Sequence, residues 1–463
     1  MMKRPANQTA TMLSALRNGS KLRAGLEDSW ALALANAARA WAGARTGPSR
    51  RALQGAAVDE PGISVVIPSR QGRGLLERML GAVEQDLRSG PRQGEIIVVD
   101  NGSTDGTAEF LRQRRPAARV EAHADPLSFS RAANRGAALA RYSRLCLLNN
   151  DMEIEPGFFA ALEAAFEEDP GLFCASAQIF FPEGFRREET GRTAMRRWRG
   201  LSPDDYPVFC DLPLAGESFS PVLYGSGGCS LFDRAKFLVL GGFDEFYQPA
   251  YVEDLDLGYR AWLRGWPSVF VAEARVLHHH RATSSRFYAS AELEEFLERN
   301  HRRFLLRTVR SSDVFAGYYR HALARARRRG GRGSLSFGEL AAAANPAPAG
   351  GHLGEQEILD LTGGGVRSFP GRRTGSGGGA RLVSAGSTPA SEARIKELAG
   401  SGVLCYLSYA RPGAVPEAWL LDLCRVVTLV DGPAGSSAYR AALKEMRRRY
   451  SIGEVVSLEG EMD

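Results

Sequence analysis

Several patterns that identify common protein classes are missing from this sequence. No run of about 18 apolar residues occurs, so we expect no membrane-spanning helix. We also expect no signal peptide, because the start of the chain lacks an apolar core followed by a small-residue cleavage site. The six cysteines include no C-x-x-C pair, which favours reduced thiols in a cytoplasmic protein.

The signatures of three large enzyme classes are missing as well. No G-K-[ST] phosphate loop and no G-x-S-x-G elbow occur, which argues against a Walker-type nucleotidase and an acyl-transfer serine. The glycine run 225–228 is not a G-x-G-x-x-G that opens a helix after a strand, so it does not predict a dinucleotide site. Its glycines would still allow the backbone to approach a ligand closely.

Length and composition are those of a globular protein with more than one domain. The chain has 463 residues, 44% hydrophobic and 24% charged, with a net charge of +6. Residues 299–332 contain eleven Arg and one acid, interleaved with Phe304, Leu305, Phe315, Tyr318 and Tyr319. This segment is either a solvated basic helix or a surface for anionic headgroups. A nucleic-acid binder is a rival reading, but no recognisable module surrounds the arginines.

Short β-branched runs alternate with helix-like segments from Ile63 onward, which predicts an α/β fold. We expect a mostly parallel, doubly wound sheet and a smaller C-terminal α/β domain. The predicted divisions are a basic helical segment (1–60), the main domain (61–310), a basic and then glycine-rich linker (311–379) and the small domain (380–463). Within the first segment, the alanine-rich stretch Trp30 to Trp41 is read as a docking helix, with membrane-surface contact as the alternative.

Acidic residues follow the predicted strands, where an open α/β sheet binds its ligands. Asp100 ends IIVVD, Asp151 follows LCLLNN, and three acids lie within Glu253–Asp256. Asp151 suits a Mg²⁺ or Mn²⁺ ion that also binds substrate phosphates. The crowded acids at 253–256 suit a general base, because like charges raise carboxylate pKa values. The structural alternatives are an Asx-turn at Asp100, a strand-end turn at Asp151 and a helix cap at Asp256.

Two further segments complete the predicted site. His278, His279 and His280 follow the last predicted strand of the main domain, where one imidazole would face the same crevice, although such histidines are more often solvated. Residues 182–220 are irregular and are expected to form a mobile region over the site.

These segments together resemble family-2 glycosyltransferases of the GT-A fold, which are inverting enzymes that use nucleotide-diphosphate sugars. The resemblance covers about 63–285 in order and spacing. It is carried by ISVVIPS (63–69), EIIVVDNGSTDGT (95–107), AANRGAALAR (132–141), LLNNDMEIEPGF (147–158), GSGGCSLFDR (225–234), GGFDE (241–245) and YVEDLDLGYRA (251–261).

The resemblance implies a role for each matching residue. Asp254 would be the catalytic base with Glu253 beside it, and Asp151 and His278 (or His280) would bind Mn²⁺ or Mg²⁺. Asn149 occupies the position of the first acid in the family's D-x-D motif, so the contact that it makes with the ligand would be weaker and uncharged. Gly227, Gly228 and Asp256 would lie near the acceptor. The residues implied to contact the nucleotide are Pro68, Ser69, Asp100, Asn134 and Asn149.

The resemblance further implies the type of enzyme. The Q-x-x-R-W motif of processive polymerases is absent and no span is expected, which favours transfer of a single sugar over polysaccharide synthesis. Bacterial relatives build surface polysaccharide or O-antigen, often on lipid-linked acceptors at the inner face of the plasma membrane. The alternative is a catalytically inactive scaffold with the same fold. The role of 380–463 stays open, since fold alone does not give function.

Overall fold

The computed structural model describes residues 26–42, 52–55, 60–182, 189–279, 287–329, 335–336, 339–340, 350–373, 380–385, 391–400, 402–432 and 436–458. They form two compact units. One comprises Met1–Ser49, Trp198–Tyr206 and Glu298–Pro346, and the other Arg50–Arg197, Pro207–Leu297 and Ala347–Asp463. Within these described ranges no helix is long and apolar enough to cross a bilayer.

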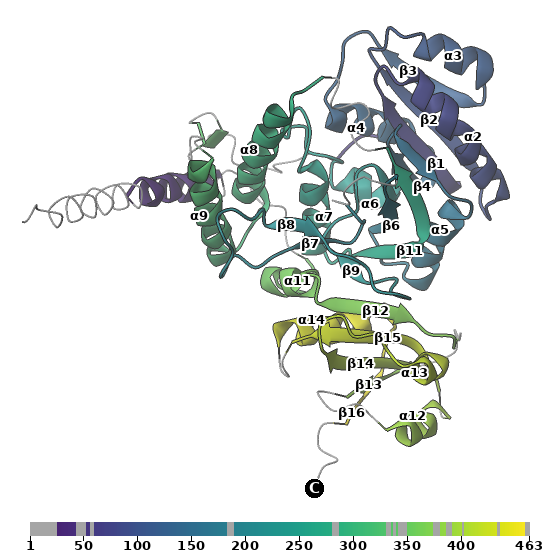
Figure 1. Ribbon diagram of the computed structural model, residues 1–463, viewed down its shortest axis with the longest axis vertical. Helices are drawn as coiled ribbons and strands as arrows, with labels where there is room; N and C mark the ends of the chain where they lie inside the picture. Colours follow the sequence, from purple (N-terminus) through teal and green to yellow (C-terminus); the bar gives the residue numbers. More distant parts are fainter. Residues whose placement is uncertain are drawn as a thin grey trace, which may run out of the picture. The chain divides into compact units, whose positions relative to one another are not determined.

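A nine-stranded sheet forms the centre of the larger unit (Figure 1). Its order is β3-β2-β1-β4-β10-β6-β11-β5, with β9 paired to β11. The pairs β1–β2, β1–β4, β2–β3 and β6–β11 are parallel, while β10, β5 and β9 run antiparallel to their neighbours. The strands are β1 (Glu60–Ser69), β2 (Gly94–Asn101), β3 (Ala118–His123), β4 (Tyr142–Leu148), β5 (Met152–Ile154), β6 (Cys174–Phe180), β9 (Pro221–Val222), β10 (Cys229–Asp233) and β11 (Ser268–His278).

Both faces of this sheet are covered by helices, as its continuous apolar strands predict. In β1, Val65 and Ile67 pack into one hydrophobic cluster and Val66 into another on the opposite face. The first cluster includes side chains of α2 (Arg73–Ser89), α3 (Thr107–Arg114) and α5 (Phe158–Glu168). The second includes side chains of α4 (Phe129–Leu139), α6 (Arg234–Val239) and α7 (Glu253–Leu263). The predicted mostly parallel, doubly wound sheet is therefore confirmed.

The predicted C-terminal α/β domain is also confirmed, and it is built on a five-stranded sheet (Figure 1). The sheet order is β12-β15-β14-β13-β16, and only β12 pairs antiparallel. Its elements are α11 (Glu355–Leu361), β12 (Val366–Pro370), β13 (Arg381–Ser384), α12 (Glu392–Ala399), β14 (Leu404–Ala410), α13 (Ala418–Leu423), β15 (Cys424–Asp431), α14 (Ser437–Arg449) and β16 (Glu454–Ser457). The strand β12 lies in the segment that was expected to be a linker. The high glycine content of that segment made its short apolar run hard to recognise.

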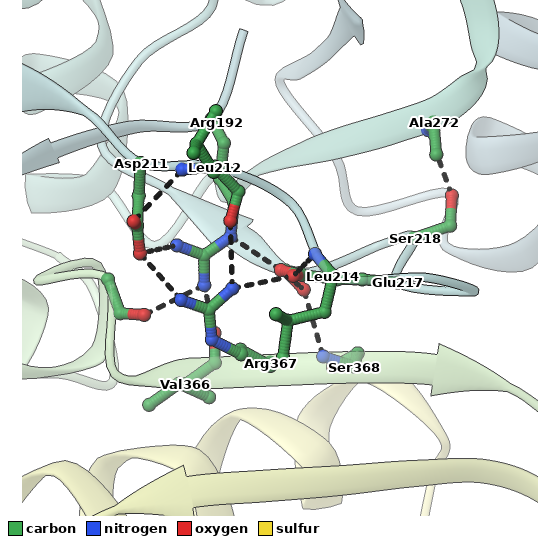
Figure 2. A network of polar contacts seen from close by, with 12 residues as sticks. Arg192, Asp211, Leu212, Leu214, Glu217, Ser218, Ala272, Val366, Arg367 and Ser368 are labelled. Carbon is green, nitrogen blue, oxygen red and sulfur yellow. Dashed lines mark hydrogen bonds and ion pairs between the residues drawn. The ribbon is translucent and has the colours of Figure 1, made fainter. Parts of the chain in front are cut away.

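A buried polar network joins β12 to the loops before β9 (Figure 2). Arg192 and Arg367 lie between two acids, Asp211 and Glu217, and each arginine bonds to both. Nη1 and Nη2 of Arg367 lie 2.8 Å from Glu217 Oε2 and 2.7 Å from Asp211 Oδ2. Arg192 Nη2 also donates to the carbonyl of Gly364 at 2.8 Å. Burial opposes ionisation of Glu217, but Arg192 and the other donors around it hold its pKa below the usual value.

Arg192, Asp211 and Glu217 therefore connect the region before β9 to the C-terminal sheet. Two short strands in this region, β7 (Thr193–Met195) and β8 (Val208–Cys210), pair antiparallel. The sequence predicted a mobile region over the site for 182–220, and of the described residues in that range only Glu189 lines the pocket described below.

Further ion pairs link the C-terminal domain to the end of α5. Arg425 binds both carboxylate oxygens of Glu168, at 3.1 and 2.8 Å, and Arg448 pairs with the buried Asp169. Arg449 Nη1 donates to the carbonyl of Phe219 at 3.1 Å. The small domain is thus fixed to the large sheet by charged side chains as well as by apolar packing.

The smaller unit contains a helix over residues 26–42, the C-terminal part of α8 (Ser290–Thr308) and α9 (Ser312–Arg328). The aromatic and apolar residues of the arginine-rich segment, considered above for contact with headgroups, are at most 1% exposed. This differs from the interpretation as a headgroup surface, because the amphipathic helices α8 and α9 bury these side chains together with Arg302, Arg307 and Arg325, while Arg320 and Arg328 stay exposed. The residues concerned are Phe304, Leu305, Phe315, Tyr318 and Tyr319.

We expect Arg367→Met to lower the free energy of unfolding by about 3 kcal/mol or more, because it leaves part of the charge on Glu217 buried without its partner. Arg372→Met is the matched control, since Arg372 is 74% exposed and its pair with Asp422 is worth at most about 1 kcal/mol. Chemical denaturation of both variants measures the difference. Equal losses would contradict a supporting role for the network.

Candidate active site

The carboxyl ends of β1, β2 and β4 meet at one edge of the large sheet. The strands are parallel, and Ser69 at the end of β1 is in register with Asp100 at the end of β2. A cavity of about 310 Å³ lies at this edge. Nine of the twelve predicted site residues line it: Pro68, Ser69, Asn149, Asp151, Gly227, Gly228, Glu253, Asp254 and His278.

The segment after β4 is held by short contacts from two directions. Asn150 Nδ2 donates to Ser69 Oγ at 2.9 Å, and the Asn149 amide donates to the carbonyl of Gly228 at 2.8 Å. A Cβ atom on Gly228 would lie 2.5 Å from Asn149 Nδ2, so glycine is needed for this close approach. These contacts hold the segment just before Asp151 in place.

Asp151 and His278 face each other across the cavity lining. Asp151 Oδ2 lies 3.6 Å from His278 Nε2, and the imidazole Nδ1 lies 3.3 Å from Glu189 Oε2. Burial opposes a charged imidazole, but the contacts with Asp151 and Glu189 raise the pKa of His278 to about 9. The pairing of β11 with β5 fixes this geometry, since His278 is in register with Met152, next to Asp151. His280, the alternative ligand, lies outside the described residues.

A strained turn presents the two acids at the start of α7. Tyr251 and Val252 both have positive φ values, 75° and 78°. For a β-branched residue this conformation costs on the order of 1–3 kcal/mol and is most common at functional sites. The helix begins at Glu253, four residues earlier than the sequence indicated, because acids are favoured in the first turn.

Glu253 and Asp254 lie side by side at the cavity, with Glu253 buried and Asp254 partly buried. Asp254 accepts hydrogen bonds from the amides of Leu255 at 2.8 Å and Gly227 at 3.4 Å, yet burial still raises its pKa to about 6. Burial and the charge of Asp254 raise the pKa of Glu253 well above its usual value. Glu253 Oε2 is buried without a hydrogen-bond partner, whereas Asp254 is only partly buried. This pair can therefore hold one shared negative charge that readily takes up a proton.

Three predicted site residues do not line the cavity and have structural contacts instead. Asp100 is buried and accepts from the Ser103 amide at 3.3 Å, three residues along the chain and not two as in an Asx-turn. The side chain of Asn134 bonds to the amide and carbonyl of Phe243, at 2.9 and 2.8 Å.

Asp256 is the third of these residues. It is fully buried and accepts from Tyr247 Oη at 3.0 Å and Arg260 Nε at 2.7 Å. The same arginine donates to the carbonyls of Leu240 and Gly242. Asp256 thus holds the loop before α7 in place, and it does so as an internal helix residue, not as the cap considered from the sequence.

The sequence did not indicate several residues that line the cavity. Glu189 has no recognisable motif around it, and the aromatic residues Phe287 and Tyr288 lie in a polar stretch. Arg70, whose guanidinium lies 3.9 Å above the Phe287 ring, directly follows Ser69. Asn101 directly follows Asp100 in the same way, so the position at the strand end is the signal that could have identified both.

The chemistry of this lining suits a charged sugar nucleotide. An acid with a raised pKa can accept a proton, backbone amides and glycines allow close approach, and Asp151 with His278 offers oxygen and nitrogen to a cation. In the described residues, however, no group of three or more His, Cys, Asp or Glu is arranged to hold a metal. Any cation here would therefore depend on oxygen atoms of the substrate.

Comparison with known proteins gives consistent matches. The model of the glycosyl transferase family 2 matches residues 64–239. N-acetylglucosaminyl-diphospho-decaprenol L-rhamnosyltransferase of Mycobacterium tuberculosis is 30% identical over 46% of this chain and 75% of its own length. The O-antigen biosynthesis protein RfbC of Myxococcus xanthus is 26% identical over 48% of this chain and 18% of its own. Among solved structures, GalNAc-T7 with UDP, GalNAc and Mn²⁺ is 18% identical with a TM-score of 0.43, over 55% and 49% of the two chains.

Two isosteric changes in the first turn of α7 are expected to have opposite effects on stability. Asp256→Asn removes the negative partner of the buried Arg260 and should lower the free energy of unfolding by about 3 kcal/mol. Asp254→Asn should leave the free energy of unfolding equal or higher at neutral pH. The pKa of Asp254 is higher in the folded protein than in the unfolded chain, so its ionisation at this pH destabilises the folded state. Urea denaturation at pH 7 measures both changes. A destabilised Asp254→Asn with an unaffected Asp256→Asn would reverse the assignment.

Proposed function

Since the chain belongs to glycosyl transferase family 2 and is a nucleotide-sugar-dependent glycosyltransferase, we propose that it transfers a single sugar with inversion to an acceptor hydroxyl. The proposed acceptor is a saccharide or a lipid-linked saccharide used in building cell-surface polysaccharide. The proposed place of the reaction is the inner face of the plasma membrane.

The observation that carries this proposal is the position and pKa of Asp254. It lines the cavity and is held by two backbone amides, and burial raises its pKa to about 6. Such a carboxylate is ionised at neutral pH and basic enough to take a proton from a hydroxyl as that oxygen attacks. Burial and the charge of Asp254 raise the pKa of Glu253 well above its usual value, which favours its protonated form and limits the negative charge at the site.

The reaction then needs no covalent intermediate with the enzyme. Asp254 accepts the proton of the acceptor hydroxyl while its oxygen forms the bond to the anomeric carbon. The bond from that carbon to the nucleoside diphosphate breaks on the other side, so the configuration inverts. Holding both substrates in line supplies much of the rate enhancement.

Asp151 and His278 are the proposed ligands of a divalent cation, Mn²⁺ or Mg²⁺. The fit rests on a buried carboxylate and an imidazole nitrogen 3.6 Å apart in the cavity wall, with Glu189 beside them. When bound, the cation would neutralise the charge that develops on the leaving diphosphate. The two residues themselves hold their positions through the pairing of β5 with β11.

Donor and acceptor contacts are proposed from the same wall. Pro68, Ser69 and Asn149 would contact the nucleoside, with Asp100 and Asn134 supporting the strand end and the loop behind them. Gly227 and Gly228 leave room beside Asp254 for the acceptor hydroxyl. The rhamnosyltransferase relative is named for an acceptor joined by a diphosphate to decaprenol, which supports a lipid-linked acceptor here.

We expect Asp151→Ala to weaken the Mn²⁺-dependent binding of the nucleotide-diphosphate sugar by at least about tenfold, since it removes a charged ligand. Asp254→Asn should bind the same donor and lose turnover. Calorimetry and product assays with UDP-, GDP- and dTDP-sugars measure both effects. The control is Glu153→Ala, which removes an exposed acid of β5 that lies two residues after Asp151 and pairs with His279. If the wild type binds no donor with either metal, the chain is better explained as an inactive scaffold.

The pH profile of kcat/KM should report the base. Below pH 6 the value should fall about tenfold per pH unit as Asp254 takes up its proton, and above it the profile should level. Asp254→Asn should lose this limb together with about 10² to 10⁴ in rate. Steady-state assays between pH 4.5 and about 8 on the two proteins provide the comparison. An unchanged acidic limb in Asp254→Asn would assign the titration to another group.

A further inference from the structure

The helix over residues 26–42 has two apolar faces, and one of them is packed against α9. Leu32, Ala35 and Ala42 are buried on this face. On the same side, the guanidinium of Arg39 lies 4.0 Å from the centre of the Phe315 ring in α9, and its Nη2 donates to the carbonyl of Val309 at 2.7 Å. This face accounts for the docking-helix interpretation made from the sequence.

The opposite face carries large apolar side chains that are exposed. Leu26 is 57% exposed, Trp30 70%, Leu34 55% and Trp41 54%. At 100° per residue these four lie within an arc of roughly 80°, and the centre of the buried face lies roughly 160° away. We call these four residues the Trp30 stripe.

The Trp30 stripe is a concentration of apolar surface, not a random scatter. In the part of the chain that the structure describes, eight large hydrophobic residues are exposed, and four of them belong to this one helix. Single exposed apolar residues need no explanation, but a contiguous patch usually marks a site of interaction. Tryptophan suits one environment in particular, the boundary of a bilayer, where its ring is buried and its N–H stays near water.

Exposed arginines lie near both ends of this helix. Near its start, Asp28 pairs with Arg327, and the next two residues, Arg328 and Arg329, are 59% and 43% exposed. Both take part in ion pairs at the surface, which leave most of their charge available to other anions.

Near the other end, Arg39 also donates to the carbonyl of the exposed Arg310. The 25 residues before the helix add Lys3, Arg4, Arg17, Lys21 and Arg23 and contain no acid. An apolar stripe bordered by cations is the combination that binds anionic lipid surfaces.

We propose that the Trp30 stripe docks on the surface of an anionic phospholipid bilayer. The stripe enters the boundary between headgroups and acyl chains, and the flanking arginines contact lipid phosphates. Docking follows from the Trp30 stripe and its flanking arginines and does not depend on the proposed function. It adds to that function by holding the enzyme at the membrane in which a lipid-linked acceptor is embedded.

Flotation of the full chain with vesicles tests the proposal. We expect binding to phosphatidylcholine vesicles that contain phosphatidylglycerol, weaker binding to phosphatidylcholine alone, and loss of binding as salt screens the arginines. The double change Trp30→Ala and Leu34→Ala should lower the bound-to-free ratio at least about tenfold. Leu212→Ala with Val415→Ala removes similarly exposed apolar side chains elsewhere and should change it less than about twofold.

Three results would overturn the proposal: no binding of the wild type, equal binding to neutral vesicles, or an unchanged bound fraction for the stripe variant. Light scattering can give a fourth result that would overturn the proposal. If the stripe variant turns a dimer into a monomer and still binds vesicles, the stripe is a contact between copies of the chain. Hydrolysis of the nucleotide sugar in solution should be the same in the stripe variant and the wild type, which also shows that the variant is folded. A wild type without hydrolysis would contradict the proposed function and leave the vesicle result intact.

Discussion

Two carboxyl groups, Glu253 and Asp254, are held side by side at the cavity, the first buried and the second partly buried, and the rest of the site depends on how the fold supports this arrangement. Burial raises both pKa values, so ionising the pair costs free energy that neighbouring contacts must offset. The turn before them is strained at Tyr251 and Val252. The loop leading to it is fixed from two sides, by Asn134 bonded to Phe243 and by the pair of Asp256 and Arg260. Asn134 and Asp256 therefore support the position of the proposed base without lining the cavity themselves.

The C-terminal domain is fixed to the transferase sheet by the same principle of satisfied buried charge. Arg192 and Arg367 each bond to Asp211 and Glu217, and backbone carbonyls take up remaining donors (Figure 2). Charge networks of this kind give a defined geometry, because a shifted domain would leave ions unpaired. Arg192, Asp211 and Glu217, which lie between β6 and β9 in the sequence, thus connect the two sheets.

Much of the site was predictable from the sequence because strand ends in a parallel sheet share one edge. Asp151 follows β4, His278 ends β11, and both line the cavity, whereas Asp254 lines it from the first turn of α7. The sequence did not reveal which way a strand-end side chain points, so Asp100 was expected in the site and Asn101 was not. Contacts over long separations were equally hidden. Nothing local to Arg192 indicates that it donates to the carbonyl of Val366, 174 positions later. The glycine-rich stretch around β12 was expected to be a linker, because the pairing of β12 with β15 is set by tertiary structure.

In the proposed mechanism, one base and no enzyme nucleophile act on the anomeric carbon. The configuration of the sugar that is released when water replaces the acceptor distinguishes this mechanism from a double displacement. Proton NMR of nucleotide-sugar hydrolysis, read before the free sugar equilibrates, gives the first anomer formed. A single displacement gives the anomer opposite to that of the donor. Release of the same anomer would require two displacements and a covalent intermediate, and would contradict the role assigned to Asp254.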